Sequence, residues 1–187
     1  RLTPERQRNV LRYWIDSVNS VPLPDRQRLL RILSEVIPAA EDAEPCIRWP
    51  GGQVRRYAGL LYLLTTEPAS ITSPLKWDFS DRLELDDERV LLATPCKGEG
   101  LKADLIKQGT ITVRFRQGGE VCRPVGRGHR HSLKNLLQEW GVPPWERNRV
   151  PLLYVNEAIA AVVGYCVCEP YQAGSDEAGV IITDADS

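Results

Sequence analysis

The chain has 187 residues, of which 42% are hydrophobic and 26% charged, and its formal net charge is −1. This size and composition suit one large or two small globular domains. No apolar run is long enough to span a membrane, and residues 1–25 are too charged for a signal peptide. The five Cys residues lack the regular spacing of a secreted disulfide framework, so we expect free thiols, a cytoplasmic location and no membrane partner.

The first 66 residues have the pattern of two helices followed by three strands. Thr3-Pro4-Glu5 favours a helix start, and apolar residues then recur at helical spacing up to Val18. Asp25 opens a second amphipathic helix, which Pro38 ends. "CIRW", "QVRRY" and "LLYLLTT" are typical of short strands, with Pro50-Gly51-Gly52 as a hairpin turn. We expect the strands to pack on the helical hairpin.

Residues 67–106 have the pattern of a linker with connecting strands, and residues 107–187 that of a separate domain. "RLEL" and "RVLLAT" are expected strands of the linker, while "PCKGEGLKADLIKQG" is an expected loop. In the last block "TITVRFR", "VPLLYV" and "AIAAVVGYCVCE" are expected strands, and Ser132 and Gly141 bracket an expected helix. The predicted fold class is α+β: a helical hairpin with short antiparallel strands, then a small domain with a mostly antiparallel sheet and one main helix.

The charge is unevenly distributed. Residues 111–150 carry 8 Lys/Arg against 3 Asp/Glu, whereas residues 151–187 carry 6 Asp/Glu and no Lys or Arg. A basic patch on a nearly neutral protein indicates an anionic partner, unless the patch is paired with the acidic tail. The Arg fork suits phosphate, and Gly126 and Gly128 let backbone amides approach one. The candidate RNA-binding residues are Arg114, Arg116, Arg123, Arg127, Arg130, Lys134, Arg147 and Arg149.

Two other kinds of site find less support in the sequence. There is no phosphate-binding loop or serine elbow, and a nucleophile pair of Cys122 with a His has no evident third group to orient it. Cys166, Cys168, His129 and His131 provide four metal-ligand side chains, but their spacing differs from that of usual zinc sites. We therefore predict no catalytic residues and no metal, and expect buried thiols in the apolar strand.

The sequence resembles that of a known family. "RFRQGGEVCRPVGRGHRHSLKNLLQEWGVPPWERNRVPLLYVNEAIAAVVGY" resembles the C-terminal domain of bacterial tRNA(Ile)-lysidine synthetase, most specifically over "LKNLLQEWGVPPWERNRVPLLY". "EDAEPCIRW" and "VRRY" resemble the substrate-recognition domain of the same family. The resemblance implies a helical substrate-recognition domain at 1–66, a linker with connecting strands at 67–106 and a tRNA-binding α+β domain at 107–187.

The resemblance also implies a reaction and a set of partners. This family uses ATP to activate C2 of the wobble cytidine of tRNA(Ile) and then attaches lysine there, and its C-terminal domains hold the tRNA. The "SGGxDS" loop of the family's catalytic domain does not occur in these 187 residues, and the chain starts at Arg1 without any Met. We therefore expect the tRNA-binding C-terminal part of an ATP-dependent ligase. The catalytic domain, lysine, ATP and Mg would belong to the parent enzyme, and this chain alone would hold no cofactor and be inactive.

Two alternatives of other classes remain open on the residues alone. The first is a protein-interaction module that docks its basic face on an acidic partner or on its own catalytic domain. The second is an independent hydrolase that uses the Cys and His residues.

Overall fold

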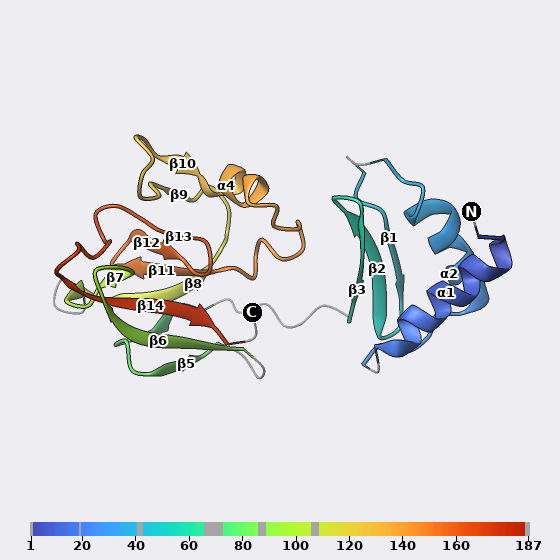
Figure 1. The fold of residues 1–187 in the computed structure, drawn as a ribbon, viewed down its shortest axis with the longest axis horizontal. Helices are drawn as coiled ribbons and strands as arrows, with labels where there is room; N and C mark the ends of the chain where they lie inside the picture. The colour runs from blue at the N-terminus through green and yellow to red at the C-terminus, as the bar shows by residue number, and fades with distance from the viewer. Residues whose placement is uncertain are drawn as a thin grey trace. The chain divides into compact units, whose positions relative to one another are not determined.

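The computed structural model describes residues 2–18, 20–40, 43–65, 73–85, 89–105 and 109–185, which form two compact units, Arg1–Ala69 and Ser70–Ser187 (Figure 1). Unit one combines antiparallel strands with helices around one core, and the described part of unit two combines antiparallel strands with a helix around two cores. The predicted α+β class is therefore confirmed. Within the described residues, every helix is too short or too polar to cross a membrane.

The first helix of unit one begins where its capping residue predicts. Helix α1 spans Pro4–Ser17, and the Oγ1 of Thr3 accepts a hydrogen bond from the Arg6 amide at 3.4 Å. Pro4 fits the first helical position because that position has no intrahelical amide bond to lose. Leu11 and Ile15 are the buried residues of α1. They mark the side of the helix that packs on the core.

The second helix changes its hydrogen-bond pattern along its length. Helix α2 spans Arg26–Arg31, and the Asp25 carboxylate caps it by accepting the Arg28 amide at 2.8 Å. The chain continues as a π-helix, η1, over Ile32–Val36, in which the Ile37 amide donates to the Ile32 carbonyl at 3.1 Å. The predicted cap at Asp25 is thus confirmed, while the wider π-turn was not foreseen.

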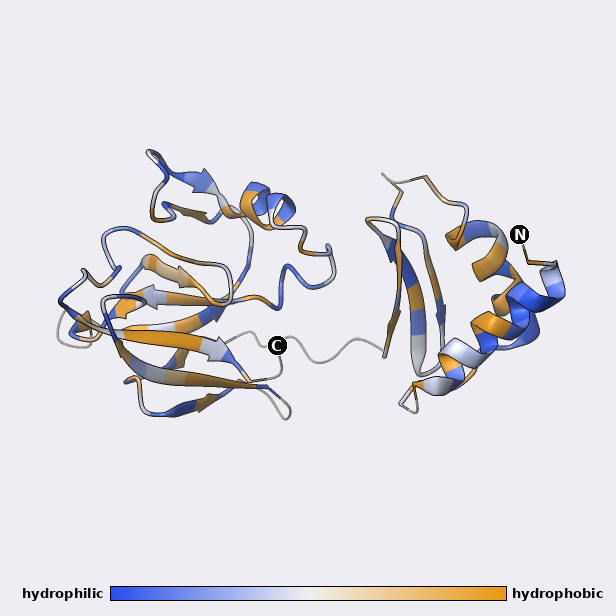
Figure 2. Ribbon diagram, in the orientation of Figure 1, coloured by the Kyte–Doolittle hydropathy of each residue, from blue (hydrophilic) through white to orange (hydrophobic). Residues whose placement is uncertain are grey.

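Three antiparallel strands complete unit one, in the order β1-β2-β3. Their bounds are Cys46–Trp49, Gly52–Tyr57 and Leu60–Leu64. One face of the sheet buries Ile47 and Val54 against Ile15, Ile32 and other apolar residues of the helices. Figure 2 shows hydrophobic residues in both the helices and the strands of this unit. The expected packing of strands on a helical hairpin is confirmed.

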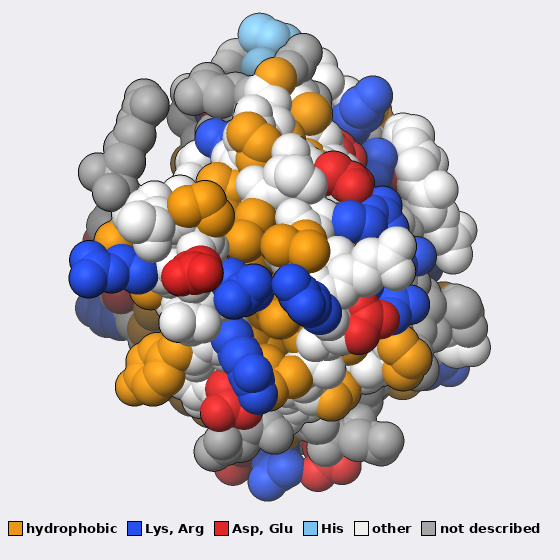
Figure 3. Space-filling model, turned by 90° about the vertical axis from the view of Figure 1, so that its right-hand side faces the viewer, with side chains coloured by type: hydrophobic (Ala, Val, Ile, Leu, Met, Phe, Trp, Pro, Cys, Tyr) orange, Lys and Arg blue, Asp and Glu red, His pale blue; other side chains and the backbone are white. Residues whose placement is uncertain are grey.

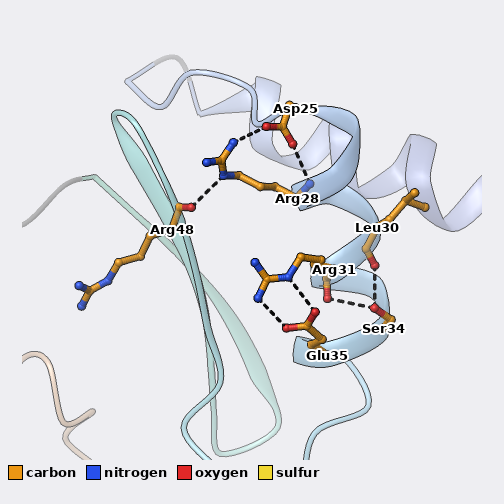
Figure 4. A network of polar contacts seen from close by, with 7 residues as sticks. All are labelled: Asp25, Arg28, Leu30, Arg31, Ser34, Glu35 and Arg48. Atoms are coloured by element: carbon orange, nitrogen blue, oxygen red, sulfur yellow. Dashed lines mark hydrogen bonds and ion pairs between the residues drawn. The ribbon is translucent and has the colours of Figure 1, made fainter.

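The helices also carry apolar side chains on their solvent side. Figure 3 views the molecule from the side on which α1 and α2 lie in Figure 1, and Arg or Lys side chains there lie among hydrophobic ones. Val10, Tyr13, Leu30 and Ile37 are 42–77% exposed, and Figure 4 shows the Leu30 side chain on the side of α2 away from the strands. Unit one therefore has a mixed basic and apolar helical surface in addition to its sheet.

Unit two consists of three layers. The first is a four-stranded sheet in the order β5-β6-β14-β7, the second a five-stranded sheet in the order β13-β12-β11-β8-β4, and the third is α4 with the short β9–β10 pair (Figure 1). The bounds are β4 Leu75–Lys76, β5 Arg82–Glu84, β6 Val90–Lys97, β7 Leu101–Lys102, β8 Ile111–Phe115, β9 Val121–Cys122, β10 His131–Ser132, α4 Leu133–Glu139, β11 Pro151–Val155, β12 Ala158–Val162, β13 Cys166–Val167 and β14 Ala178–Asp184.

The five-stranded sheet is buried on both faces. Leu153 and its same-face neighbours pack on the four-stranded sheet, while Leu152 and its neighbours pack on α4. Successive side chains of a strand point to opposite faces, so one strand supplies both cores. This explains why "VPLLYV" is apolar at almost every position instead of alternating.

The boundary expected at residue 107 is not a boundary of the fold. Trp77, Leu91 and Leu101 lie in the same core as Val113 and Leu153, so the expected linker strands are part of unit two. The expected loop after Pro95 is also partly strand, since β6 continues to Lys97 and β7 follows. Both depend on pairing with β14, about 80 residues later in the chain. Local sequence patterns carry no signal for such a distant partner.

Replacing Leu137 with Ala should destabilise unit two by about 2–5 kcal/mol, because Leu137 is fully buried between α4 and the sheet and its loss leaves a cavity. Denaturant unfolding monitored by circular dichroism measures the change. Gln138→Ala on the exposed side of the same helix is the matched control and should change stability by less than about 0.5 kcal/mol. Equal losses in the two variants would contradict the packing of α4.

Candidate nucleic-acid interface

The glycine-rich segment "RPVGRGHR" is the loop between β9 and β10, which pair through Cys122 and His131. Its first part is fixed to the edge of β13, since the Val125 amide donates to the Val167 carbonyl at 3.0 Å and the Glu169 amide donates to the Arg123 carbonyl at 2.8 Å. The loop is therefore attached at its base to the central sheet.

The two glycines of this loop have open space around them. Gly126 has a φ of +81°, a conformation that favours glycine over other residues, whereas Gly128 has no positive φ. A Cβ atom built on either residue meets nothing within 4 Å. A ligand can therefore approach the backbone of this loop closely, as the sequence predicted for Gly126 and Gly128.

The start of α4 differs from the prediction. Ser132 occupies the N-cap position, but in the described structure its side chain makes no capping hydrogen bond. The first amide of the helix, that of Leu133, donates instead to the Glu120 carbonyl at 2.9 Å. Helix α4 has only seven residues. The start of α4 therefore offers no separate anion-binding element beside the loop.

The end of α4 follows the prediction closely. Gly141 has a φ of +73°, and the Val142 amide donates to the Leu137 carbonyl at 2.9 Å. This is the hydrogen-bond pattern of a helix stopped by a left-handed glycine. Leu133, Leu136 and Leu137 are all fully buried. The apolar side of the helix is thus used for packing, and its solvent side carries the candidate site.

Arg130 and Lys134 differ from the other six predicted cations in their lack of a polar partner among the described residues. Both side chains are exposed, and neither has an ion pair or hydrogen bond with the part of the chain that the structure describes. Arg130 lies in the loop next to the exposed His129, whose ring centre is 4.2 Å from that of His131, and Lys134 lies in the first turn of α4. An anionic ligand at this surface would meet two fully hydrated positive charges.

Arg123 and Arg127 are paired with carboxylates of neighbouring elements. Arg123 lies 3.0 Å from Glu169, and the guanidinium of Arg127 donates two hydrogen bonds to Glu139 at the end of α4. The hydrogen bonds from Arg127 hold the pKa of Glu139 below its usual range. The four side chains are 33–54% exposed, and an ion pair so accessible to water contributes at most about 1 kcal/mol. A phosphate group can therefore replace either carboxylate at small cost.

Arg114 and Arg116 are positioned within the fold itself. Arg114 donates to both carboxylate oxygens of Glu157 at 2.8 Å, and its guanidinium lies 4.5 Å from the centre of the Tyr154 ring. Arg116 donates to the Asn148 side chain at 3.1 Å and lies 3.8 Å from Glu120. The structure brings these two arginines to the α4 side of the central sheet, but their charges are already matched.

Arg147 and Arg149 support the loop after α4. The Nε of Arg147 donates to the Val142 carbonyl at 2.9 Å, and Arg149 lies 3.8 Å from Glu146. The Arg149 carbonyl accepts a hydrogen bond from Arg89 at 3.0 Å. These contacts indicate a structural contribution from both residues.

The acidic residues after position 150 pair only in part with the basic segment. Glu157 and Glu169 neutralise Arg114 and Arg123, but the later acids have other partners. Those later pairs are Asp176 with Lys97, Glu177 with Lys102 and Asp184 with Arg89. The acidic residues after position 150 therefore neutralise two of the eight candidate cations. Arg130 and Lys134 are not among these two and can contact an anionic ligand.

Three thiols gather where β9 meets β13, which the spacing in the sequence did not reveal. Cys122 and Cys168 are buried, as expected for Cys168, but Cys166 is partly exposed. Hydrogen bonds from Cys122 and Cys168 lower the pKa of the Cys166 thiol, and the same contacts raise the pKa of the other two. The positive charge of Arg127 adds to the lowering at Cys166. Among the described residues no group of three or more His, Cys, Asp or Glu is arranged to hold a metal ion.

Two family models match this chain. The model described as the TilS substrate binding domain matches residues 1–62, and the model described as the TilS substrate C-terminal domain matches residues 111–183. Both describe parts of one protein, and together they cover most of the chain. The chain therefore belongs to the TilS family and carries its substrate-binding and C-terminal domains, as the resemblance predicted.

Curated relatives carry the name tRNA(Ile)-lysidine synthase. The chain is 47% identical over 181 residues to the relative from Coxiella burnetii. The aligned region covers 96% of this chain and 40% of that relative. It is 39% identical over 166 residues to that of Legionella pneumophila strain Paris, which covers 88% and 37%. The chain thus spans about 40% of the length of these relatives. A solved structure titled "Crystal structure of TILS C-terminal domain" overlaps 60% of this chain and 96% of its own, with 16% identity and a TM-score of 0.46.

The thiol of Cys166 should react with iodoacetamide at a rate that changes little between pH 8.5 and 6.5, because a lowered pKa keeps it a thiolate as the pH falls. Peptide mass spectrometry after timed alkylation measures the rate. Free cysteine is the reference, since an ordinary thiol is only about 1% ionised at pH 6.5. Cys168→Ala, which removes one hydrogen-bond donor, should restore part of the pH dependence. A rate for Cys166 that rises with pH as steeply as that of free cysteine would contradict the arrangement.

Proposed function

We propose that this chain is the tRNA-binding portion of a tRNA(Ile)-lysidine synthase, an enzyme that uses ATP to attach lysine to C2 of the wobble cytidine of tRNA(Ile). The observation that carries the proposal is the presence of the substrate-binding and C-terminal domains of one family in one chain. The name of these relatives supports the choice of substrate. The charges of Arg130 and Lys134, which are exposed and have no ion pair within the described ranges, support a contact with an anionic polymer.

The loop and the start of α4 act in this proposal as a clamp on the RNA backbone. Arg130 and Lys134 bind phosphates directly, while Arg123 and Arg127 exchange Glu169 and Glu139 for phosphate oxygens. Gly126 and Gly128 leave room for the sugar–phosphate chain over the loop backbone. Double-stranded RNA offers shape and phosphates more than base edges, so contacts of this kind would position a stem of the tRNA without reading its sequence.

The proposed RNA-binding surface is held in position by Arg114, Arg116 and Arg147. Arg114 and Arg116 tie β8 to the turns around Glu157 and Asn148, and Arg147 ties the loop after α4 to the end of that helix. In this proposal they act on RNA only through the position of the surface that they support. Catalytic residues, ATP, Mg and lysine belong to the catalytic domain of the parent enzyme, and the complex works in the cytoplasm.

Binding of tRNA should weaken steeply with salt, because each phosphate contact releases a counterion. With about three to five contacts, the slope of log K against log salt is expected to be about −2 to −4. Lys134→Ala should weaken binding and reduce the magnitude of the slope by about one. Fluorescence anisotropy of labelled tRNA at several salt concentrations measures both quantities.

Lys97→Ala is the matched control, since Lys97 is an exposed lysine of β6 in the four-stranded sheet. It should leave the slope unchanged. A flat salt response of the wild-type chain would reject the clamp, and binding of an acidic protein in place of tRNA would favour the interaction module. Unchanged tRNA affinity in both Lys134→Ala and Arg130→Ala would place the contact on another surface.

The chain alone should incorporate no lysine into tRNA(Ile) and hydrolyse no ATP, because its 187 residues contain no "SGGxDS" loop. Radiolabelled lysine and purified tRNA(Ile) give the direct assay. A full-length relative is the positive control for the tRNA and the reagents. Lysidine formation by the chain alone would contradict the assignment of catalysis to another domain.

A further inference from the structure

Three cysteines meet at one place in unit two, and the proposed function uses none of them. Cys122 lies in β9, Cys166 in β13 and Cys168 directly after that strand. Cys122 and Cys168 belong to the core beneath α4, and Cys166 packs against that core. Backbone hydrogen bonds and the pairing of Pro124 with Cys168 hold the segment after β9 against β13. The fold thus brings together thiols from two elements that are distant in the sequence.

One of the three thiols can be reached from solvent. Cys122 and Cys168 are 4% and 0% exposed, whereas Cys166 is partly exposed. Cys166 also lines an open cleft of about 220 Å³, together with Gly164, Tyr165 and apolar residues of the neighbouring strands. A small solute can therefore reach Cys166 without unfolding the domain. The two buried thiols can react only after Cys166 has done so.

The proton is unequally shared within this cluster. Hydrogen bonds from Cys122 and Cys168 lower the pKa of the Cys166 thiol to about 4, and the charge of Arg127 adds to the lowering. The hydrogen bond with Cys166 raises the pKa of the Cys122 thiol to about 12. At neutral pH Cys166 is thus a thiolate, and Cys122 is a protonated donor to it. The thiolate is the reactive form of cysteine.

We propose that this cluster is a peroxide-modification site, in which Cys166 is oxidised by hydrogen peroxide and Cys122 then closes a disulfide with it. In the first step the Cys166 sulfur attacks one peroxide oxygen, the O–O bond breaks, and hydroxide leaves and takes up a proton to become water. Cys166 is then a sulfenic acid. In the second step the Cys122 sulfur attacks that of Cys166, the S–O bond breaks, and the hydroxyl group leaves with the Cys122 proton as water. The two sulfurs together lose two electrons, which the peroxide accepts.

The geometry favours Cys122 over Cys168 as the second thiol. Cys166 and Cys168 are two positions apart on one extended segment, which separates their Cα atoms by about 6.6 Å. That separation is near the upper limit for a disulfide, whereas Cys122 approaches from another strand. Oxidation also prepares Cys122 for its attack. Once Cys166 is a neutral sulfenic acid, the contact with a thiolate that raised the pKa of Cys122 is gone, and Cys122 loses its proton more readily.

The two remaining cysteines are internal controls for the oxidation of Cys166. Cys46 and Cys96 are also partly exposed, so solvent reaches them as well. In the described structure their thiols donate to oxygen atoms instead of sulfur, to the Oε1 of Gln53 at 3.5 Å and to the carbonyl of Glu99 at 3.2 Å. Neither contact provides a second thiol that could capture a sulfenic acid. We therefore expect no intramolecular disulfide at either control.

The test treats the whole reduced chain with a stoichiometric amount of hydrogen peroxide at neutral pH. The remaining thiols are then blocked with N-ethylmaleimide, and the chain is digested without reductant. A peptide pair bridged through Cys122 and Cys166 should appear, lighter by two hydrogen atoms than the reduced pair, and dithiothreitol should remove it. Cys46 and Cys96 should remain labelled by maleimide. Tandem mass spectrometry assigns the bridge, because Cys166 and Cys168 share one tryptic peptide.

Two variants separate the contributions of the two thiols. Cys122→Ala should lose the bridge and accumulate a sulfenic acid at Cys166, which dimedone traps, whereas Cys166→Ser should protect Cys122 and Cys168 from oxidation. Circular dichroism checks that each variant is folded, and the mapping of the wild-type chain needs no variant. A wild-type chain with no bridge, or with one between Cys166 and Cys168, would overturn the proposal. Oxidation of Cys46 and Cys96 to the same extent as Cys166 would overturn it as well.

Discussion

The strand β11 is buried on both faces, and the second unit is organised around it. Leu152 faces α4 and Leu153 faces the four-stranded sheet, and both are inaccessible to solvent. The strand also pairs with β8 on one side and β12 on the other. A strand with hydrogen-bonded neighbours and two apolar faces cannot shift by one residue without exchanging its two cores. Its register therefore fixes the positions of α4, the glycine-rich loop and the arginines of β8.

The basic segment is better understood as two layers of charge than as a single patch. Arg114, Arg116 and Arg147 donate to side chains or carbonyls of neighbouring turns and hold the surface together. Arg130 and Lys134 lie outside that layer and keep their full charge toward solvent. Arg123 and Arg127 form a third group, because each is paired with an exposed carboxylate. Since exposed ion pairs contribute little stability, a phosphate can replace that carboxylate. This ordering could not be read from the spacing of arginines.

The sequence by itself determined those elements whose signals lie within a few neighbouring residues. Thr3 and Asp25 cap the first two helices, Gly141 stops α4, and the apolar runs of β11 and β12 are buried, because caps, left-handed glycines and hydrophobic periodicity act over a few residues. It also carried the family resemblance that the comparisons confirmed.

Only the tertiary structure decided which strands pair with one another and which charged side chains form ion pairs. The strands before residue 107 belong to unit two because they pair with β14, far along the chain, and no local pattern encodes that partner. The same holds for the pairing of Arg127 with Glu139 across a loop and for the meeting of Cys122 with Cys166. Contacts between residues distant in sequence arise from packing, and packing is set by the whole chain at once.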